Sequence, residues 1–183
     1  NSTGDTFNLA TTLGGTPIDT TGTQSGLQYI SPRGVDLADA GDADAPLFQN
    51  YIFVSDTYRF VLVFGTNDYS QTYLDPMLIR WSDQEDPYTW TPAATNQAGS
   101  LRLSHGSQII TAVQTRQEIV VFTDTSLYSM QYVGAPYVWT AQLLGDNVSI
   151  VGQNAAAVAS GRVFWMGVDK FYVYDGRVQT LNC

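Results

Sequence analysis

EIVVFTDTSLYSM at residues 118–130 and RVFWMGVDKFYVY at residues 162–174 share one pattern. In each stretch an apolar strand is followed by a short polar turn and then by a second strand with aromatic residues, and the two copies lie 44 residues apart. A further apolar stretch precedes each copy, at residues 109–113 and 155–159. A repeat of about 40–50 residues with three or four short antiparallel strands is typical of β-propeller blades.

The rest of the chain from residue 51 onward has the same character. Short β-branched and aromatic runs are separated by Gly, Asp, Asn, Ser or Pro, and no segment has the periodicity of an amphipathic helix. Further strands are expected at residues 51–54, 58–65, 77–81 and 139–144, and after the turn at residues 175–176. The sequence therefore predicts an all-β fold of β-propeller-like blades. A sandwich of meandering hairpins, which shows turn signals at similar spacing, is the alternative.

Residues 1–50 differ in composition from the rest of the chain. They are rich in Thr, Gly, Asp and Ala, and such a segment buries too little apolar area to fold alone. We predict an irregular polar and acidic arm or linker at residues 1–50 and a propeller-like domain at residues 51–183. Only about three blades fit in that domain, whereas closed propellers usually have four or more. We therefore expect that the ring is completed by missing sequence or by other chains, or that it does not close. The absence of an initiator Met also indicates a processed chain or a fragment.

The composition favours contact with other proteins over binding of nucleic acid. Charged residues make up 14% of the chain and aromatic residues 13%, with eleven tyrosines. Interface cores are depleted of charge and enriched in aromatic residues. The formal net charge of −9, without a basic run, argues against a site that grips phosphate, although an acidic surface lets DNA slide past without adhering. No stretch of 18 apolar residues predicts a membrane span, and no signal peptide is visible.

No pattern of catalytic or cofactor-binding residues is evident. His105 is the only histidine, and its neighbours Ser104 and Ser107 are too close in sequence to form a Ser–His–Asp triad with it, so we interpret it as a turn residue. Cys183 is the only cysteine, which excludes a disulfide within the chain and a thiolate metal cluster. We therefore expect no enzymatic activity, no cofactor and no metal.

An acidic turn between two tryptophans is the most distinctive local motif. We predict that it is a structural turn made by Trp81, Ser82, Asp83, Asp86, Pro87 and Trp90. The side chains of Ser82 or Asp83 can accept hydrogen bonds from backbone N–H groups, Pro87 restricts the backbone, and the two tryptophans are expected to clamp the base. Calcium binding and acid–base catalysis by the clustered carboxylates are the alternatives, but the spacing lacks the order of an EF-hand loop. The turn also resembles, imperfectly, the Asp-box hairpins of sialidase-type propellers.

Several segments resemble the tail proteins of short-tailed bacteriophages. The stretch IRWSDQEDPYTWTP at residues 79–92 looks like the RWSD…DP…W turn of these proteins, and residues 98–103, 114–119, 126–132 and 166–176 are similar to the same group. The group comprises the tail nozzle proteins (tail tubular protein B) and the related head-closure, DNA-stabilising proteins. The resemblance covers residues 77–183 approximately, and family members are usually much longer.

The resemblance implies a virion structural protein with a β-propeller. Such a subunit assembles as a homo-oligomer, typically a hexameric ring, below the portal and adaptor, contacts other tail proteins, and lines or seals the channel for DNA ejection. The DNA passes through without specific binding, no membrane is involved, and assembly in the host cytoplasm places the protein in the phage tail. The alternative is a carbohydrate-binding or glycan-cleaving propeller module, based on the Asp-box-like turn and aromatic residues suited to sugar stacking. A calcium-stabilised adhesion module is a third hypothesis.

Overall fold

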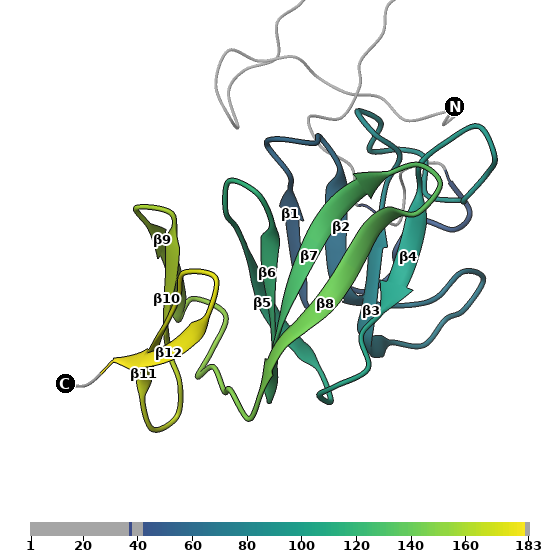
Figure 1. Cartoon of the computed structure of the whole chain (residues 1–183). Helices are drawn as coiled ribbons and strands as arrows, with labels where there is room; N and C mark the ends of the chain where they lie inside the picture. The colour runs from purple at the N-terminus through teal and green to yellow at the C-terminus, as the bar shows by residue number, and fades with distance from the viewer. Residues whose placement is uncertain (1–36, 38–41, 182–183) are drawn as a thin grey trace, which may run out of the picture. The chain divides into compact units, whose positions relative to one another are not determined.

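Three four-stranded antiparallel sheets make up the computed structural model, which describes Leu37 and residues 42–181 (Figure 1). Most of the predicted arm and residues 182–183, including Cys183, lie outside the described residues. Sheet 1 contains β1 (Tyr51–Val54), β2 (Val61–Thr66), β3 (Asp75–Trp81) and β4 (Gly99–Arg102). Sheet 2 contains β5 (Ile109–Gln114), β6 (Ile119–Thr123), β7 (Ser126–Gly134) and β8 (Val138–Asp146). Sheet 3 contains β9 (Ala156–Ala159), β10 (Arg162–Met166), β11 (Phe171–Tyr174) and β12 (Val178–Leu181).

Each sheet is a meander in which every strand pairs with the next one along the chain. The predicted all-β class is confirmed, and the three sheets do not close into a barrel but form propeller-like blades of a partial propeller. One strand, β4, was not among the predicted strands. It begins with Gly99 and Ser100, which have low β propensity, and it is held by backbone pairing with β3.

The 44-residue repeat is preserved in the strand register. Val121 lies opposite Tyr128 in sheet 2, and the corresponding residues of sheet 3, Trp165 and Tyr172, lie opposite each other in the same way. Because directly opposed residues share a face of an antiparallel sheet, corresponding positions point to corresponding faces in the two sheets. Residues 44 positions apart are therefore structurally equivalent in sheets 2 and 3.

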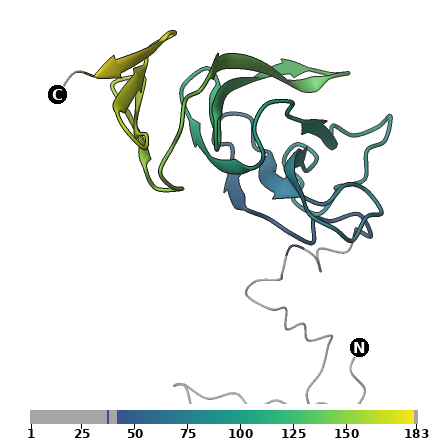
Figure 2. The same cartoon turned by 90° about the horizontal axis from the view of Figure 1, so that it is seen from below.

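Sheet 2 lies between sheets 1 and 3 and is buried on both faces (Figures 1 and 2). Along β6, Ile119 and Val121 belong to the cluster shared with sheet 1, whereas Val120 and Phe122 belong to the cluster shared with sheet 3. This alternation follows from the two-residue period of a strand. Continuous apolar runs such as the one in β6 thus mark a sheet with neighbours on both sides.

The first strands of the three sheets lie next to one another. Strand β5 contacts both β1 and β9. Before β1, the side chain of Asn50 donates to the carbonyl of Ile109 at 3.5 Å, and its own carbonyl accepts a 2.8 Å hydrogen bond from Gln153. At the other end of β1 and β5, the side-chain amide of Gln114 donates to the Thr57 hydroxyl at 3.1 Å. The first strand of each blade is therefore the one nearest a common axis, as in a propeller.

The described part of the predicted arm packs on sheet 1. Ala45 is 2% exposed and lies in a cluster with Val63 of β2 and Trp90, while Leu37 packs against the same cluster. Asn50 continues the pairing of β1 by donating its backbone N–H to the carbonyl of Phe64 at 3.0 Å. Residues 42–50 thus cover part of the face of sheet 1 that points away from sheet 2.

Candidate assembly surface

The predicted structural turn follows β3 and is organised by its two aspartates. Asp83 accepts hydrogen bonds from the backbone N–H groups of Gln84 and Gln97, both at 2.8 Å. Asp86 accepts from the Tyr88 N–H and from the Thr89 hydroxyl, both at 2.8 Å. Both carboxylates therefore accept hydrogen bonds from donors in the turn, and Asp83 also links the turn to Gln97.

The other four residues of the turn are placed on both sides of sheet 1. Ser82 is fully buried and accepts the Val61 N–H at 3.1 Å. Trp81 lies in the cluster between sheets 1 and 2, whereas Trp90 lies in the cluster on the opposite face, where its indole N–H donates to the Pro87 carbonyl at 2.8 Å. The tryptophans therefore do not close on one base of the turn; each anchors it to a different core.

Asp42 ties the turn to the segment before β1. Its carboxylate accepts hydrogen bonds from the N–H groups of Trp90 at 2.7 Å and Thr91 at 2.9 Å, and from the Thr91 hydroxyl at 2.6 Å. Partial burial acts to raise the pKa of Asp42, but these bonds and one from the N–H of Asp44 outweigh it and hold the pKa well below its usual value. The ionised carboxylate is thus a structural link.

Replacement of Asp42 by Asn is expected to lower the free energy of unfolding by about 1–3 kcal/mol at neutral pH, because charge-assisted hydrogen bonds are lost. Since the folded-state pKa is depressed, this stabilisation is present above the unfolded pKa near 3.8 and disappears as the pH falls toward the folded value. Urea unfolding between pH 2 and 7 should therefore show a shallower acid decline for Asp42→Asn than for wild type. Asp169→Asn, in an exposed turn, is the control; an unchanged acid decline in Asp42→Asn would contradict the assignment.

Arg80 lies in the middle of the face of sheet 1 that points away from sheet 2, which we call the outer face of sheet 1. It lies opposite Val63, is fully buried, and donates to the backbone carbonyls of Asn67 at 3.2 Å and Asp44. Its guanidinium also lies 4.2 Å from the ring centroid of Tyr69. Carbonyl dipoles and an aromatic face, rather than a carboxylate, compensate the buried charge.

On the face of sheet 3 that points away from sheet 2, the described part of the chain provides no such cover. We call it the outer face of sheet 3 and define it by Ala157, Phe164, Met166, Phe171 and Leu181, which the register places on one side. Met166, Phe171 and Leu181 are 43%, 46% and 41% exposed. All five residues contribute to the lining of a hollow of about 290 Å³. A contiguous apolar surface of this kind marks an interaction site more often than a solvated face.

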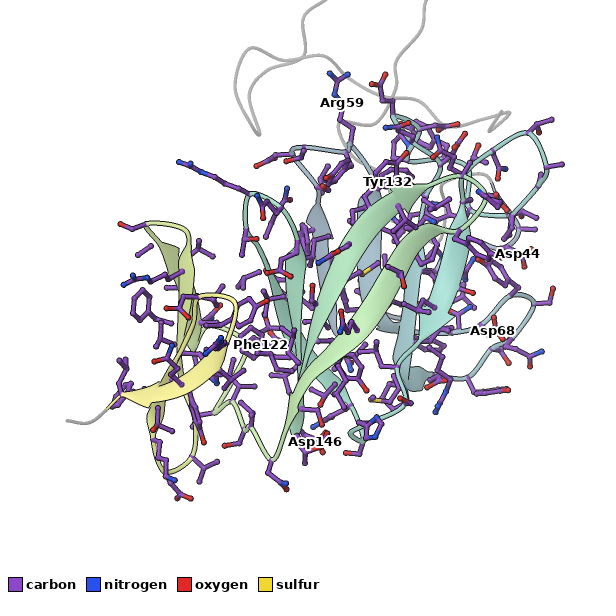
Figure 3. All side chains as sticks on the ribbon, viewed as in Figure 1. Asp44, Arg59, Asp68, Phe122, Tyr132 and Asp146 are labelled. Carbon is purple, nitrogen blue, oxygen red and sulfur yellow. The ribbon has the colours of Figure 1, made fainter. Side chains whose placement is uncertain are left out.

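The repeat shows what normally covers these positions. Phe122 and Leu127 of sheet 2 correspond to Met166 and Phe171 of sheet 3, and they are 1% and 0% exposed beneath sheet 3. Figure 3 labels Phe122 where sheet 2 faces sheet 3, and its ring meets the Trp165 ring edge-on at 5.3 Å. Burying one such side chain fully stabilises by about 1.5–3 kcal/mol. Sheet 3 thus presents one half of an interface whose other half is absent from the described residues.

A hollow at one end of sheet 2 contains the only histidine. It is lined by residues that include Ser104, His105, Ser126 and Asp146, and Figure 3 places Asp146 at the opposite end of the sheets from Arg59. Ser104 Oγ lies 2.9 Å from His105 Nδ1, and Ser126 donates to Asp146 at 3.0 Å. Within the described residues no hydrogen bond joins His105 to a carboxylate, so the orienting link of a triad is missing.

A second hollow, of about 340 Å³, lies between the turns of sheets 2 and 3. Arg116, Glu118 and Tyr174 are among its lining residues. Burial, together with a hydrogen bond to Glu118 and the charge of that carboxylate, raises the pKa of Tyr174 to about 12. Ser129 also donates to Glu118, so the carboxylate is already engaged by side chains of sheets 2 and 3. Its role here is to join the two sheets.

Among Leu37 and residues 42–181, no group of three or more His, Cys, Asp or Glu side chains is arranged to hold a metal ion. Over the same residues, no helix has the length and apolar character needed to cross a bilayer.

The outer face of sheet 3, which the sequence interpretation did not single out, is the most prominent surface feature. The signal that could have identified it is the row of apolar residues at Phe164, Met166 and Phe171, which alternates with Val163 and Trp165 in the second copy of the repeat.

No protein-family model matches the chain, and no curated protein is significantly similar to it.

Proposed function

We propose that this chain is a structural subunit of a short-tailed phage virion, which packs through its sheet faces into a tail nozzle, tail tube or head-closure ring. The observation that carries the proposal is the outer face of sheet 3, an apolar blade surface with three residues more than 40% exposed. The corresponding surface of sheet 2 is sealed by the next sheet. The resemblance of residues 79–92 and 166–176 to tail proteins supplies the virion context.

The charge distribution is consistent with this role. With a net charge of −9, the chain repels the phosphate backbone, so DNA leaving through a channel built from such subunits would not adhere to its wall. The ring in the proposal is a homo-oligomer, hexameric by resemblance, in contact with the portal, the adaptor and other tail proteins.

One argument for the carbohydrate-binding alternative, an aromatic residue of the turn that is free to stack on a sugar, does not hold for Trp90. Trp90, the aromatic residue of the Asp-box-like turn, is fully buried and its indole N–H is bonded within the turn. It therefore has no face on which a sugar ring could stack. Tyr73, Tyr88 and Tyr137 are exposed aromatic side chains that could contact a glycan, so glycan binding is tested beside the virion role.

Antibodies against the purified chain test the proposal. We expect them to label the tail of short-tailed phage particles in electron micrographs, and we expect no signal for the chain on a glycan array. Labelling of capsids or host membranes instead of tails would overturn the proposal. Glycan binding that is lost in Tyr88→Ala but kept in the exposed control Tyr137→Ala would favour the carbohydrate module.

A further inference from the structure

The outer face of sheet 1 is only partly covered. Residues 42–50, Arg80 and Trp90 cover β2 and β3, but no described residue covers the β1 part. Ile52 and Val54 lie opposite Val63 and Val61 on this face and are 41% and 57% exposed. We call these two residues the β1 patch.

The β1 patch corresponds to a buried position in the next blade. Ile52 lies opposite Val63 on the first two strands of sheet 1, and Ala112 lies opposite Val121 on the first two strands of sheet 2. Ile52 therefore corresponds to Ala112. Ala112 is 1% exposed because it packs in the cluster between sheets 1 and 2. The β1 patch is therefore the place where a preceding blade would pack, just as the outer face of sheet 3 is the place for a following blade.

One molecule thus presents the outer face of sheet 3 and, on sheet 1, the β1 part of the complementary face, whose β2 and β3 part is covered by residues 42–50 and Trp90. We infer that copies of this chain assemble head to tail, with the outer face of sheet 3 of one copy packed on the β1 patch side of sheet 1 of the next. The contact continues the series formed by the sheet 1–sheet 2 and sheet 2–sheet 3 interfaces. Such a heterologous contact forms a ring when the rotation between copies closes. The inference rests on the proposed function, because it specifies the contact between subunits of the homo-oligomer.

Charge favours the head-to-tail arrangement over a contact between two like faces. Residues 156–181 carry three cationic and two acidic side chains, whereas residues 42–102 carry eight acidic and three cationic ones. Sheet 3 is therefore net positive and the region of sheet 1 is net negative, so opposite charges meet when these regions pair. Two copies of sheet 3 would instead bring like charges together.

The repeat also identifies one charged contact. Arg162 on the outer face of sheet 3 corresponds to Glu118 of sheet 2, whose carboxylate interacts with Tyr174 of the following sheet. Tyr174 lies opposite Val163, two positions from the Trp165–Tyr172 pair. Ser82 donates its N–H to the carbonyl of Val61, two positions from the Val63–Arg80 pair, so it takes the equivalent place in sheet 1. Ser82 directly precedes the acidic turn with Asp83, Glu85 and Asp86. Arg162 of one copy would thus face the acidic turn of the next.

Two double variants test the inference by mass photometry and native mass spectrometry of the full chain. Met166→Asp with Phe171→Asp disables the sheet 3 half, and Ile52→Asp with Val54→Asp disables the β1 half. Because all four side chains are exposed, the variants should fold, which circular dichroism checks. Wild type is expected to be oligomeric, and each variant alone is expected to assemble at least about tenfold more weakly, because charge is buried at an apolar contact. Val133→Asp with Tyr137→Asp, which replaces exposed side chains at the β7–β8 hairpin and touches neither the outer face of sheet 3 nor the β1 patch, should assemble as wild type does.

An equal mixture of the two variants gives the decisive result. Each mixed pair retains one intact interface, between sheet 3 of the β1 variant and sheet 1 of the sheet 3 variant, so a complex of two chains should appear. Wild-type assembly by either variant alone would overturn the head-to-tail contact, and so would a monomeric wild type at every concentration tested. These outcomes are separate from the proposed function, which is decided by labelling of phage tails.

Discussion

Replacement of Trp165 by alanine is expected to loosen sheet 3 from sheet 2 and to lower the stability of sheet 3 by about 3–5 kcal/mol. Trp165 is 2% exposed, meets Phe122 edge-on, and stacks on Tyr172 with ring centroids 5.1 Å apart. Removing the indole leaves a cavity in the cluster that joins the two sheets. Since sheet 3 has a neighbouring sheet on only one face among the described residues, it has few other contacts to compensate.

Hydrogen exchange resolved by segment measures this effect. Amides in residues 156–181 should lose protection in Trp165→Ala, while amides in β2 and β3 should keep most of theirs, because cooperative units can open separately. Trp165→Phe keeps a ring in place and removes an indole N–H that has no hydrogen-bond partner, so it should cost less than about 1.5 kcal/mol. Met166→Ala, the adjacent residue on the outer face, is the matched control. Equal loss of protection in sheets 1 and 3 would contradict separate anchoring of sheet 3.

Much of the fold could be predicted because it depends on local alternation. The apolar and aromatic runs from residue 51 onward contain β-branched and aromatic residues at a two-residue period, and turn residues separate them. Eleven of the twelve strands overlap a predicted run, and the 44-residue repeat reappears as a shared register. Strand β4 escaped prediction because Gly99 and Ser100 form a strand only through the partner that β3 provides.

The candidate surface could not be predicted in the same way, because exposure depends on the neighbours of a sheet and not on its own pattern. Phe122 and Met166 occupy equivalent places in similar stretches, yet one is 1% and the other 43% exposed. The sequence likewise predicts a strand around Arg80, but it does not predict that the guanidinium is buried or which groups it contacts. Its partner carbonyls belong to Asp44 and Asn67, which are distant in sequence and reach it only through tertiary packing.

Replacement of Arg80 by alanine is expected to lower the free energy of unfolding by about 3–5 kcal/mol. The substitution removes a buried, hydrogen-bonded side chain and leaves both a cavity and unpaired carbonyls. Arg80→Met keeps most of the volume and should cost about 1–3 kcal/mol, the penalty for leaving the carbonyls of Asp44 and Asn67 without donors. The difference between the two variants separates packing from hydrogen bonding.

Arg102 provides the matched comparison on the same sheet. Its side chain is 60% exposed and pairs with Asp75 at 2.7 Å, so Arg102→Ala should cost less than about 1 kcal/mol. Urea unfolding of the three variants beside wild type measures the series, and an Arg80→Ala value equal to that of Arg102→Ala would refute the buried role. Loss of Arg80 should also disturb the cover of sheet 1 formed by residues 42–50 and Trp90. Because the inferred head-to-tail contact uses the part of that face left open beside the cover, Arg80→Ala should weaken assembly even under conditions where the chain remains folded.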